Sequence, residues 1–274
     1  MATKVSVEKF ESISSYVATI GSRPNNEVFK NKFSSKDSSG EFAGTKTYDE
    51  SVKLIEVGYK EGLDKIAKDG GERINFRANS ARTLPRAGVV GFAPIVPNAI
   101  LGLPNSMLCK ETIPHKAKVI SIWYDITACC NIETSEIARA GRHMLELINK
   151  LELQDFRVEL RVCTGYCGSS QCCFSVVKVK TDRQPMNPLK IAYPFTHASF
   201  LRRQGLKWLE TYPKVEDSSL RHGYGTALYY KVDGGDRRTW LINHDVLPKG
   251  CFYTDFYEAR DNDSSALMKL MNLK

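Results

Sequence analysis

One short stretch, residues 118–125, constrains the fold of this chain more than any other. Its sequence, Lys-Val-Ile-Ser-Ile-Trp-Tyr-Asp, carries apolar side chains at both odd and even positions. Successive side chains of a strand point to opposite faces, so such a strand must lie inside a sheet that is covered on both sides. We therefore predict an α/β fold in which helices flank a mixed central sheet and residues 118–125 form an inner strand.

The residues after this strand predict a helix and then two paired strands. The core-facing positions 137, 141, 144, 148 and 151 follow helical spacing, and Thr134 or Ser135 is expected to cap this helix. Apolar residues alternate over 156–163, and a turn at 168–170 leads to a returning strand over 173–180. Further along, the patterns predict a helix over 187–210 with a start or kink at Pro194, a hairpin over 227–246 and a short helix over 264–273.

The first part of the chain is expected to be a separate segment. Residues 6–20 have helical spacing, and residues 21–46 are rich in Ser, Asn, Gly and Lys. Thr47 and Glu50 fit a capping box, and the helix that follows is expected to end at residues 69–71. We predict an N-terminal helix and flexible loop over 1–46 and an α/β domain over 47–274, in which 47–117 form a helix and an extended cover and 118–274 the sheet core.

The charge balance favours acidic partners without requiring them. The chain has 39 Lys and Arg against 31 Asp and Glu, a formal net charge of +8. Residues 202–240 carry cations interleaved with aromatic residues, a combination that is suited to binding single-stranded nucleic acid. A helix face that is simply exposed to water would show the same charges. The candidate binding residues, for nucleic acid or another partner, are Arg202, Arg203, Lys207, Arg221, Arg237, Arg238 and Trp240.

A candidate metal site follows the inner strand. Asp125 and Thr127 stand where α/β sheets commonly bind ligands, and Asp245 is a possible later acidic ligand. The arrangement resembles the metal site of von Willebrand factor A domains, which begins Asp-x-Ser-x-Ser. Here the third position is Cys129, a poor ligand for a hard cation. A turn that is capped by Asp125 and Thr127 is the alternative interpretation.

Four of the eight cysteines, Cys163, Cys167, Cys172 and Cys173, fall close together. In a strand, the adjacent Cys172 and Cys173 point to opposite faces and would not share one zinc ion. We expect reduced, buried thiols in a hairpin, with a zinc site and a functional disulfide or reactive thiol as alternatives.

Three stretches resemble a family of uncharacterised bacteriophage and prophage proteins. These are residues 48–62, residues 141–151 with Phe156-Arg157-Val158-Glu159, and residues 188–210 with His197-Ala198-Ser199-Phe200-Leu201-Arg202-Arg203. The resemblance implies a phage-encoded protein of the host cell cytoplasm and no known activity.

The remaining observations restrict the class of function. No complete catalytic signature is present, no cofactor is expected, and no run approaches the ~18 apolar residues of a membrane span. The start of the chain lacks the apolar run of a signal peptide. We therefore predict a non-enzymatic phage protein that binds a host or viral macromolecule, most simply another protein. Nucleic-acid binding through residues 202–240 and a metal-dependent module at Asp125 are the alternatives.

Overall fold

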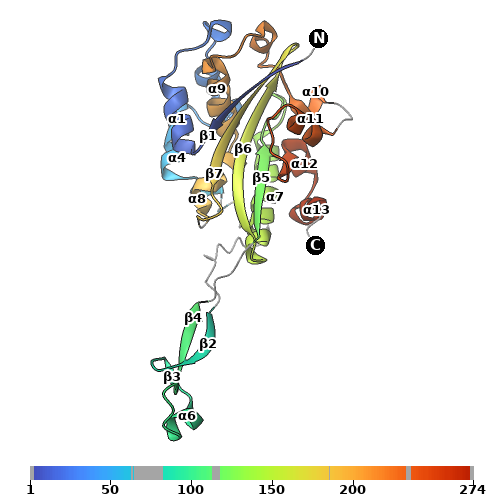
Figure 1. Cartoon of the computed structure of the whole chain (residues 1–274). Helices are drawn as coiled ribbons and strands as arrows, with labels where there is room; N and C mark the ends of the chain where they lie inside the picture. Colours follow the sequence, from blue (N-terminus) through green and yellow to red (C-terminus); the bar gives the residue numbers. More distant parts are fainter. Residues whose placement is uncertain are drawn as a thin grey trace. The chain divides into compact units, whose positions relative to one another are not determined.

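The chain divides into two compact units. The computed structural model describes residues 3–62, 64, 83–112, 118–184, 186–232 and 236–271 (Figure 1). The larger unit comprises residues 1–76 and 119–274, and the smaller unit comprises residues 77–118. This division differs from the predicted boundary at residue 46, because the N-terminal residues belong to the main sheet.

The larger unit is built on a mixed sheet with the strand order β1-β7-β6-β5-β9, which confirms the predicted α/β class. Parallel pairs join β1 to β7, β6 to β5, and β5 to β9, whereas β6 and β7 form an antiparallel hairpin. A short strand, β8, pairs with the end of β6. The bounds are β1 (Lys4–Phe10), β5 (Val119–Asp125), β6 (Arg157–Cys167), β7 (Gln171–Lys180), β8 (Thr226–Ala227) and β9 (Phe252–Asp255).

The strand β5 lies between β6 and β9, as its apolar pattern predicted. Ile122 and Tyr124 are buried in the larger hydrophobic core on one face of the sheet. Trp123 points to the other face and joins a smaller core. Each face of β5 is therefore removed from water, which explains why the strand is apolar at odd and even positions alike.

The helix α7 (Thr134–Leu153) carries the larger core, and its predicted stripe is confirmed: residues 137, 141, 144, 148 and 151 are all buried. Its N-cap is Glu133, one residue before the expected Thr134 or Ser135, and Glu133 forms a reciprocal capping box with Glu136. The helices that line the same core are α1 (Ile13–Ser22), α8 (Pro188–Thr196), α9 (Leu206–Thr211), α12 (Phe256–Asp261) and α13 (Ser264–Leu270).

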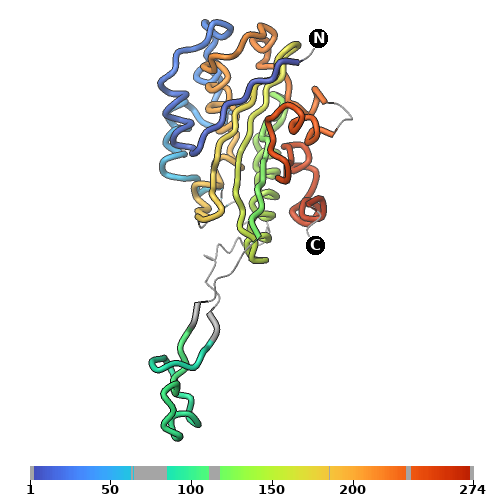
Figure 2. The backbone as a smooth tube through the Cα atoms, in the orientation of Figure 1, coloured from blue at the N-terminus to red at the C-terminus, as the bar shows by residue number. Residues whose placement is uncertain are grey.

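The N-terminal segment differs from the predicted helix and loop. Residues 4–10 form the edge strand β1, which pairs with β7 more than 160 residues away, and helix α1 begins only at Ile13 (Figure 2). Three short helical turns follow within the expected loop: η1 (Glu27–Phe29), α2 (Ser34–Asp37) and α3 (Gly40–Ala43). The alternation of Val5 and Val7 with polar residues suits a strand, and it is this pairing with β7 that selects strand over helix.

The capping of helix α4 (Tyr48–Val57) confirms part of the predicted motif. The Thr47 side chain accepts a hydrogen bond from the Glu50 amide, as expected, whereas the Glu50 carboxylate accepts from the Lys46 amide. The helix ends at Gly58, whose φ of +94° is left-handed. The predicted end at residues 69–71 lies outside the described residues.

The C-terminal part contains one wrong prediction. A helix was expected over 187–210, and the structure forms it in three pieces, α8, a π-helical segment η2 (Phe200–Gly205) and α9. The hairpin over 227–246 is wrong: this stretch holds helices α10 (Leu228–Lys231) and α11 (Arg237–Asn243). The Asp236 side chain accepts from the Thr239 amide and so begins a helix instead of a second strand. The final helix, α13, is confirmed.

The smaller unit has its own sheet, where an extended cover was predicted. Strands β2 (Thr83–Gly88), β4 (Met107–Thr112) and β3 (Ala93–Pro94) are antiparallel in the order β2-β4-β3. A short helix, α6 (Val96–Ile100), follows β3. Residues 89–92, a possible strand in the sequence, connect β2 to β3 instead.

Candidate functional site

Three of the predicted binding cations are buried. Arg203 is completely buried, and its guanidinium donates to the backbone carbonyls of residues 35, 36, 38, 45 and 46 at 2.7–3.3 Å. Arg202 donates to the carbonyls of Phe42 and Ile132, and Lys207 donates to the Asn25 amide oxygen at 3.0 Å. The expected exposed helix face is therefore wrong for these residues. Their charges are instead satisfied by oxygens of the protein, most of which are backbone carbonyls of residues 35–46.

The other four predicted binding residues do not form one cationic surface. Arg221 and Arg238 are exposed, but Arg237 is half-buried and pairs with Asp255 at 2.7 Å and with Glu258 at 3.0 Å. Trp240 stacks on His244, with 4.0 Å between ring centroids. Of the seven predicted residues, the structure leaves two cations fully available to a polyanion.

Asp125 and Thr127 lie together in a buried turn after β5. Asp125 accepts hydrogen bonds from the Thr127 amide at 2.9 Å and from its hydroxyl at 2.6 Å, and the Tyr253 hydroxyl lies 3.3 Å from the other carboxylate oxygen. Burial raises the pKa of Asp125 to about 7. The Thr127 hydroxyl also accepts from the Gly165 amide at 2.7 Å, so the oxygens of both side chains are occupied by the protein itself.

The proposed third metal ligand, Asp245, is exposed, unlike Asp125 and Thr127. Within the residues that the structure describes, no cluster of three or more His, Cys, Asp or Glu side chains is arranged to hold a metal. The turn-capping interpretation of Asp125 and Thr127 therefore accounts for their contacts.

A second carboxylate, which the sequence analysis missed, lies beside Asp125. Asp255 of β9 is in register with Asp125 on the neighbouring parallel strand. Burial raises the pKa of Asp255, and the Arg237 guanidinium opposes this shift. No local pattern pairs residues 125 and 255, because only the assembled sheet makes them neighbours.

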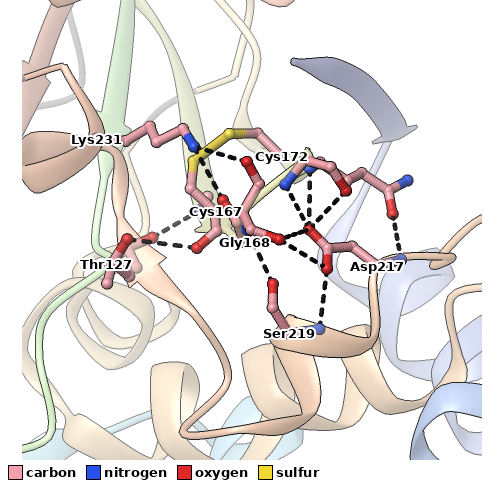
Figure 3. The surroundings of a disulfide bond; sticks show 12 residues. Thr127, Cys167, Gly168, Cys172, Asp217, Ser219 and Lys231 are labelled. Atoms are coloured by element: carbon pink, nitrogen blue, oxygen red, sulfur yellow. Dashed lines mark hydrogen bonds between the residues drawn. A yellow bond between two sulfur atoms is a disulfide. The ribbon is translucent and has the colours of Figure 1, made fainter. Parts of the chain in front are cut away.

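The cysteines of the β6–β7 hairpin are not all reduced, contrary to our expectation. Cys167 and Cys172 are opposite each other in the hairpin and form a disulfide (Figure 3). Cys172 belongs to the smaller core and Cys173 to the larger one, so adjacent residues do point to opposite faces, as predicted. Burial raises the pKa of the Cys163 thiol and that of Cys173, to about 12 for the latter, which makes both weak nucleophiles.

The turn beside the disulfide is held by polar contacts (Figure 3). The Asp217 carboxylate accepts from the amides of Ser170 at 2.7 Å, Ser219 at 2.9 Å and Gln171 at 3.1 Å. These hydrogen bonds hold the pKa of Asp217 far below its ordinary value, although its partial burial acts in the opposite direction. The Lys231 ammonium donates to the Gly168 carbonyl at 3.0 Å. The disulfide thus closes a hairpin whose turn is already rigid.

A pocket of about 720 Å³ is lined by residues of α7, the end of α8 and residues 41–62 of the larger unit. One wall is a face of α7 with Ser135, Arg139 and Arg142, and the end of α8 contributes Thr196 and His197. Residues 41–62 supply further lining, including Glu41, Tyr59 and Glu61. Its volume lies in the range that is typical of small-molecule sites.

The orientation of the His197 side chain is fixed by contacts with Ser199 and Tyr59. Its Nδ1 lies 3.2 Å from the Ser199 amide, which can only donate, and 2.8 Å from the Ser199 hydroxyl. The Tyr193 hydroxyl lies 2.8 Å from the Ser199 oxygen, and the Tyr59 ring meets the imidazole edge-on at 4.7 Å. Ser199 is completely buried, so its hydroxyl orients His197 and does not meet a substrate. These contacts fix the orientation of the imidazole at the wall of the pocket.

The smaller unit exposes apolar side chains instead of burying them. No residue among 85–110, the part of this unit whose burial is described, is buried. The most exposed side chains are Val90 at 81%, Ile100 at 80%, Leu101 at 71% and Val89 at 70%. Phe92, Val96 and Leu103 are exposed as well. A sheet of this size without a buried core is only marginally stable by itself.

The amino-acid sequence matches a family model described as "Domain of unknown function (DUF7192)" over residues 1–250. The chain belongs to this family. An uncharacterised family was expected from the sequence, and the matched range contains the whole smaller unit and the larger unit up to residue 250. No curated protein and no solved structure matches the chain. None of the helices in the described part of the chain has both the length and the hydropathy needed to span a bilayer.

Proposed function

We propose that this chain is a non-enzymatic, phage-encoded protein that binds a host or viral protein through its smaller unit. The observation that carries the proposal is the exposure of seven large apolar side chains between residues 89 and 103. Soluble proteins rarely leave such a concentration of apolar surface uncovered unless a partner covers it.

The apolar surface is large enough for a stable interface. Full burial of one such side chain contributes about 1.5–3 kcal/mol, and these seven are 46–81% exposed. Their burial would contribute roughly 10 kcal/mol before the costs of association, a magnitude that is compatible with a specific complex. The partner that fits is a protein with an apolar groove or face of similar size.

The composition of the smaller unit favours a protein over a lipid surface. The unit contains six Lys and Arg, one acid, Glu111, and no Trp or Tyr, and only two of the cations, Arg86 and Lys110, lie within residues 83–112 with the exposed apolar side chains. Membrane-binding surfaces usually combine many Lys and Arg with interfacial Trp or Tyr. Five prolines in the unit restrict its backbone, which favours recognition by shape.

The two alternative functions, nucleic-acid binding and a metal-dependent module, have less support. A nucleic-acid site in residues 202–240 would have to work without Arg202, Arg203 and Lys207, which are buried. A metal-dependent module at Asp125 would have to displace the hydrogen bonds that Thr127 donates to that carboxylate.

The test compares matched surface substitutions. Val90→Asp and Ile100→Asp change exposed side chains of the smaller unit, and Val57→Asp changes an equally exposed valine of the larger unit. We expect a protein that is captured from infected host cells to bind the purified chain in calorimetry. That binding should be lost with Val90→Asp and Ile100→Asp and kept with Val57→Asp.

Two results would contradict the proposal. One is purified partner that binds all three variants equally well. The other is co-flotation of the chain with phosphatidylcholine vesicles that Val90→Asp abolishes, since the apolar side chains would then serve a lipid surface.

A further inference from the structure

We propose that the pocket between α7, the end of α8 and residues 41–62 binds a small zwitterion, an amino acid or a short peptide with free ammonium and carboxylate groups. The described residues that line this pocket all belong to the larger unit. The proposal is therefore independent of protein binding by the smaller unit.

The cationic side of the pocket is one face of α7. Ser135, Arg139 and Arg142 are spaced four and three residues apart, so their side chains follow one another along the helix. Arg142 has an ion-pair partner in Glu146 at 3.9 Å on the same helix. Arg139 is exposed and forms no hydrogen bond or ion pair within the described part of the chain, although its charge reaches Asp261 over a longer distance. A guanidinium in this position is suited to a carboxylate.

The anionic side comes from other elements. Glu41 of α3 and Glu61, beyond the end of α4, line the pocket, are exposed, and have no hydrogen-bond or ion-pair partner among the described residues. The third acid of the lining, Glu136, is already engaged, because it accepts from the Glu133 amide at 3.1 Å and pairs with Arg260 at 3.5 Å. Among the lining residues that the structure describes, Glu41 and Glu61 are therefore the carboxylates available to a ligand ammonium group.

Charges of both signs on different walls select the class of ligand. A simple anion would be attracted by Arg139 but repelled by Glu41 and Glu61. A simple cation would be attracted by the two carboxylates but repelled by the Arg139 guanidinium. A zwitterion satisfies both walls with charge-assisted hydrogen bonds. The volume of about 720 Å³ admits an amino acid or a short peptide and leaves room for water.

The proposal can be tested on the full chain with four probes: alanine, alanyl-alanine, N-acetyl-alanyl-alanine and alanyl-alanine amide. We expect alanine or alanyl-alanine to bind in calorimetry or ligand-observed NMR, and the choice between them distinguishes an amino acid from a peptide. Removing either charge of the ligand should weaken binding about tenfold or more, because each charge-assisted hydrogen bond accounts for at least that factor.

Variants locate the binding to this pocket. Arg139→Gln and Glu61→Gln should each weaken binding about tenfold or more, and both residues are exposed, so the fold should tolerate the changes. Arg238→Gln and Glu27→Gln are matched controls at exposed positions outside the lining and should leave binding unchanged. The proposal is overturned if neither zwitterion binds at millimolar concentration, if the blocked probes bind as tightly, or if the pocket variants behave like the controls.

Discussion

The contact between α7 and α8 offers the sharpest test of the fold, through Gly141→Ala. Gly141 lies in the middle of the core stripe of α7, where an added Cβ would stand 2.0 Å from the Phe195 carbonyl oxygen and 2.5 Å from its carbon. Ordinary contact begins at 3.4 Å, so the two helices would have to separate by about 1.4 Å. A backbone carbonyl cannot rotate away as a side chain can.

The expected magnitude follows from two opposing effects. Alanine is better than glycine within a helix by about 1 kcal/mol. Forcing an extra carbon into a packed core costs about 1–3 kcal/mol, and a clash with backbone belongs at the upper end of that range. We therefore expect Gly141→Ala to lower the free energy of unfolding by about 2 kcal/mol, or the melting temperature by about 4–8 °C.

The matched control is the same substitution in another helix. Gly21 lies in α1, and a Cβ at this position would meet nothing within 4 Å. Gly21→Ala should raise the free energy of unfolding by up to about 1 kcal/mol, because only the helix-propensity effect remains. Urea unfolding followed by circular dichroism would measure both variants. If Gly141→Ala stabilised the chain as much as Gly21→Ala does, the close packing of α7 on α8 would be refuted.

Three further predictions concern the buried polar groups and the cysteines. Arg203→Ala should lower the free energy of unfolding by about 3–5 kcal/mol, because buried carbonyl groups lose their hydrogen-bond donor. Arg238→Ala, at an exposed position, should change the free energy of unfolding by less than about 0.5 kcal/mol. The pKa of Asp125 is raised by burial from an ordinary 3.8 to about 7, so this group favours the folded state below pH 4 and loses that contribution as the pH rises through 7. Asp125→Asn should flatten this decline in urea unfolding between pH 4 and pH 7, and an unchanged pH profile would exclude a buried, neutral carboxyl. Alkylation of the unfolded, unreduced chain should modify six of the eight cysteines, and modification of all eight would contradict the disulfide. Replacing Cys167 and Cys172 by Ser should lower the free energy of unfolding by about 2 kcal/mol.

The candidate sites were less accessible to sequence reasoning than the fold. The run of cations from Arg202 onward suggested a surface, yet Arg203 is completely buried, because the turns of residues 35–46 present unsatisfied carbonyl groups to it. The sequence shows which side chains are charged, but it does not show whether a charged side chain will be hydrated or will donate to a buried carbonyl group. The 720 Å³ pocket was missed because its lining comes from three separate stretches of the chain.

The elements whose patterns are local were determined by the sequence itself. Apolar residues on both faces identify β5, the four-and-three spacing identifies α7, and alternation with a turn identifies the β6–β7 hairpin. Each pattern reports directly which side chains must leave water, and that requirement holds whatever the neighbouring elements are.

Tertiary structure alone decided the features that depend on distant partners. Residues 4–10 are a strand because β7 offers them an edge, and Asp125 meets Asp255 because β5 and β9 are neighbours in the sheet. Asp236 could have begun a strand or capped a helix, and the packing of Leu241 into the smaller core accompanies the helix. In each case the local free-energy difference between alternatives is small, so the contacts supplied by the assembled fold determine the outcome.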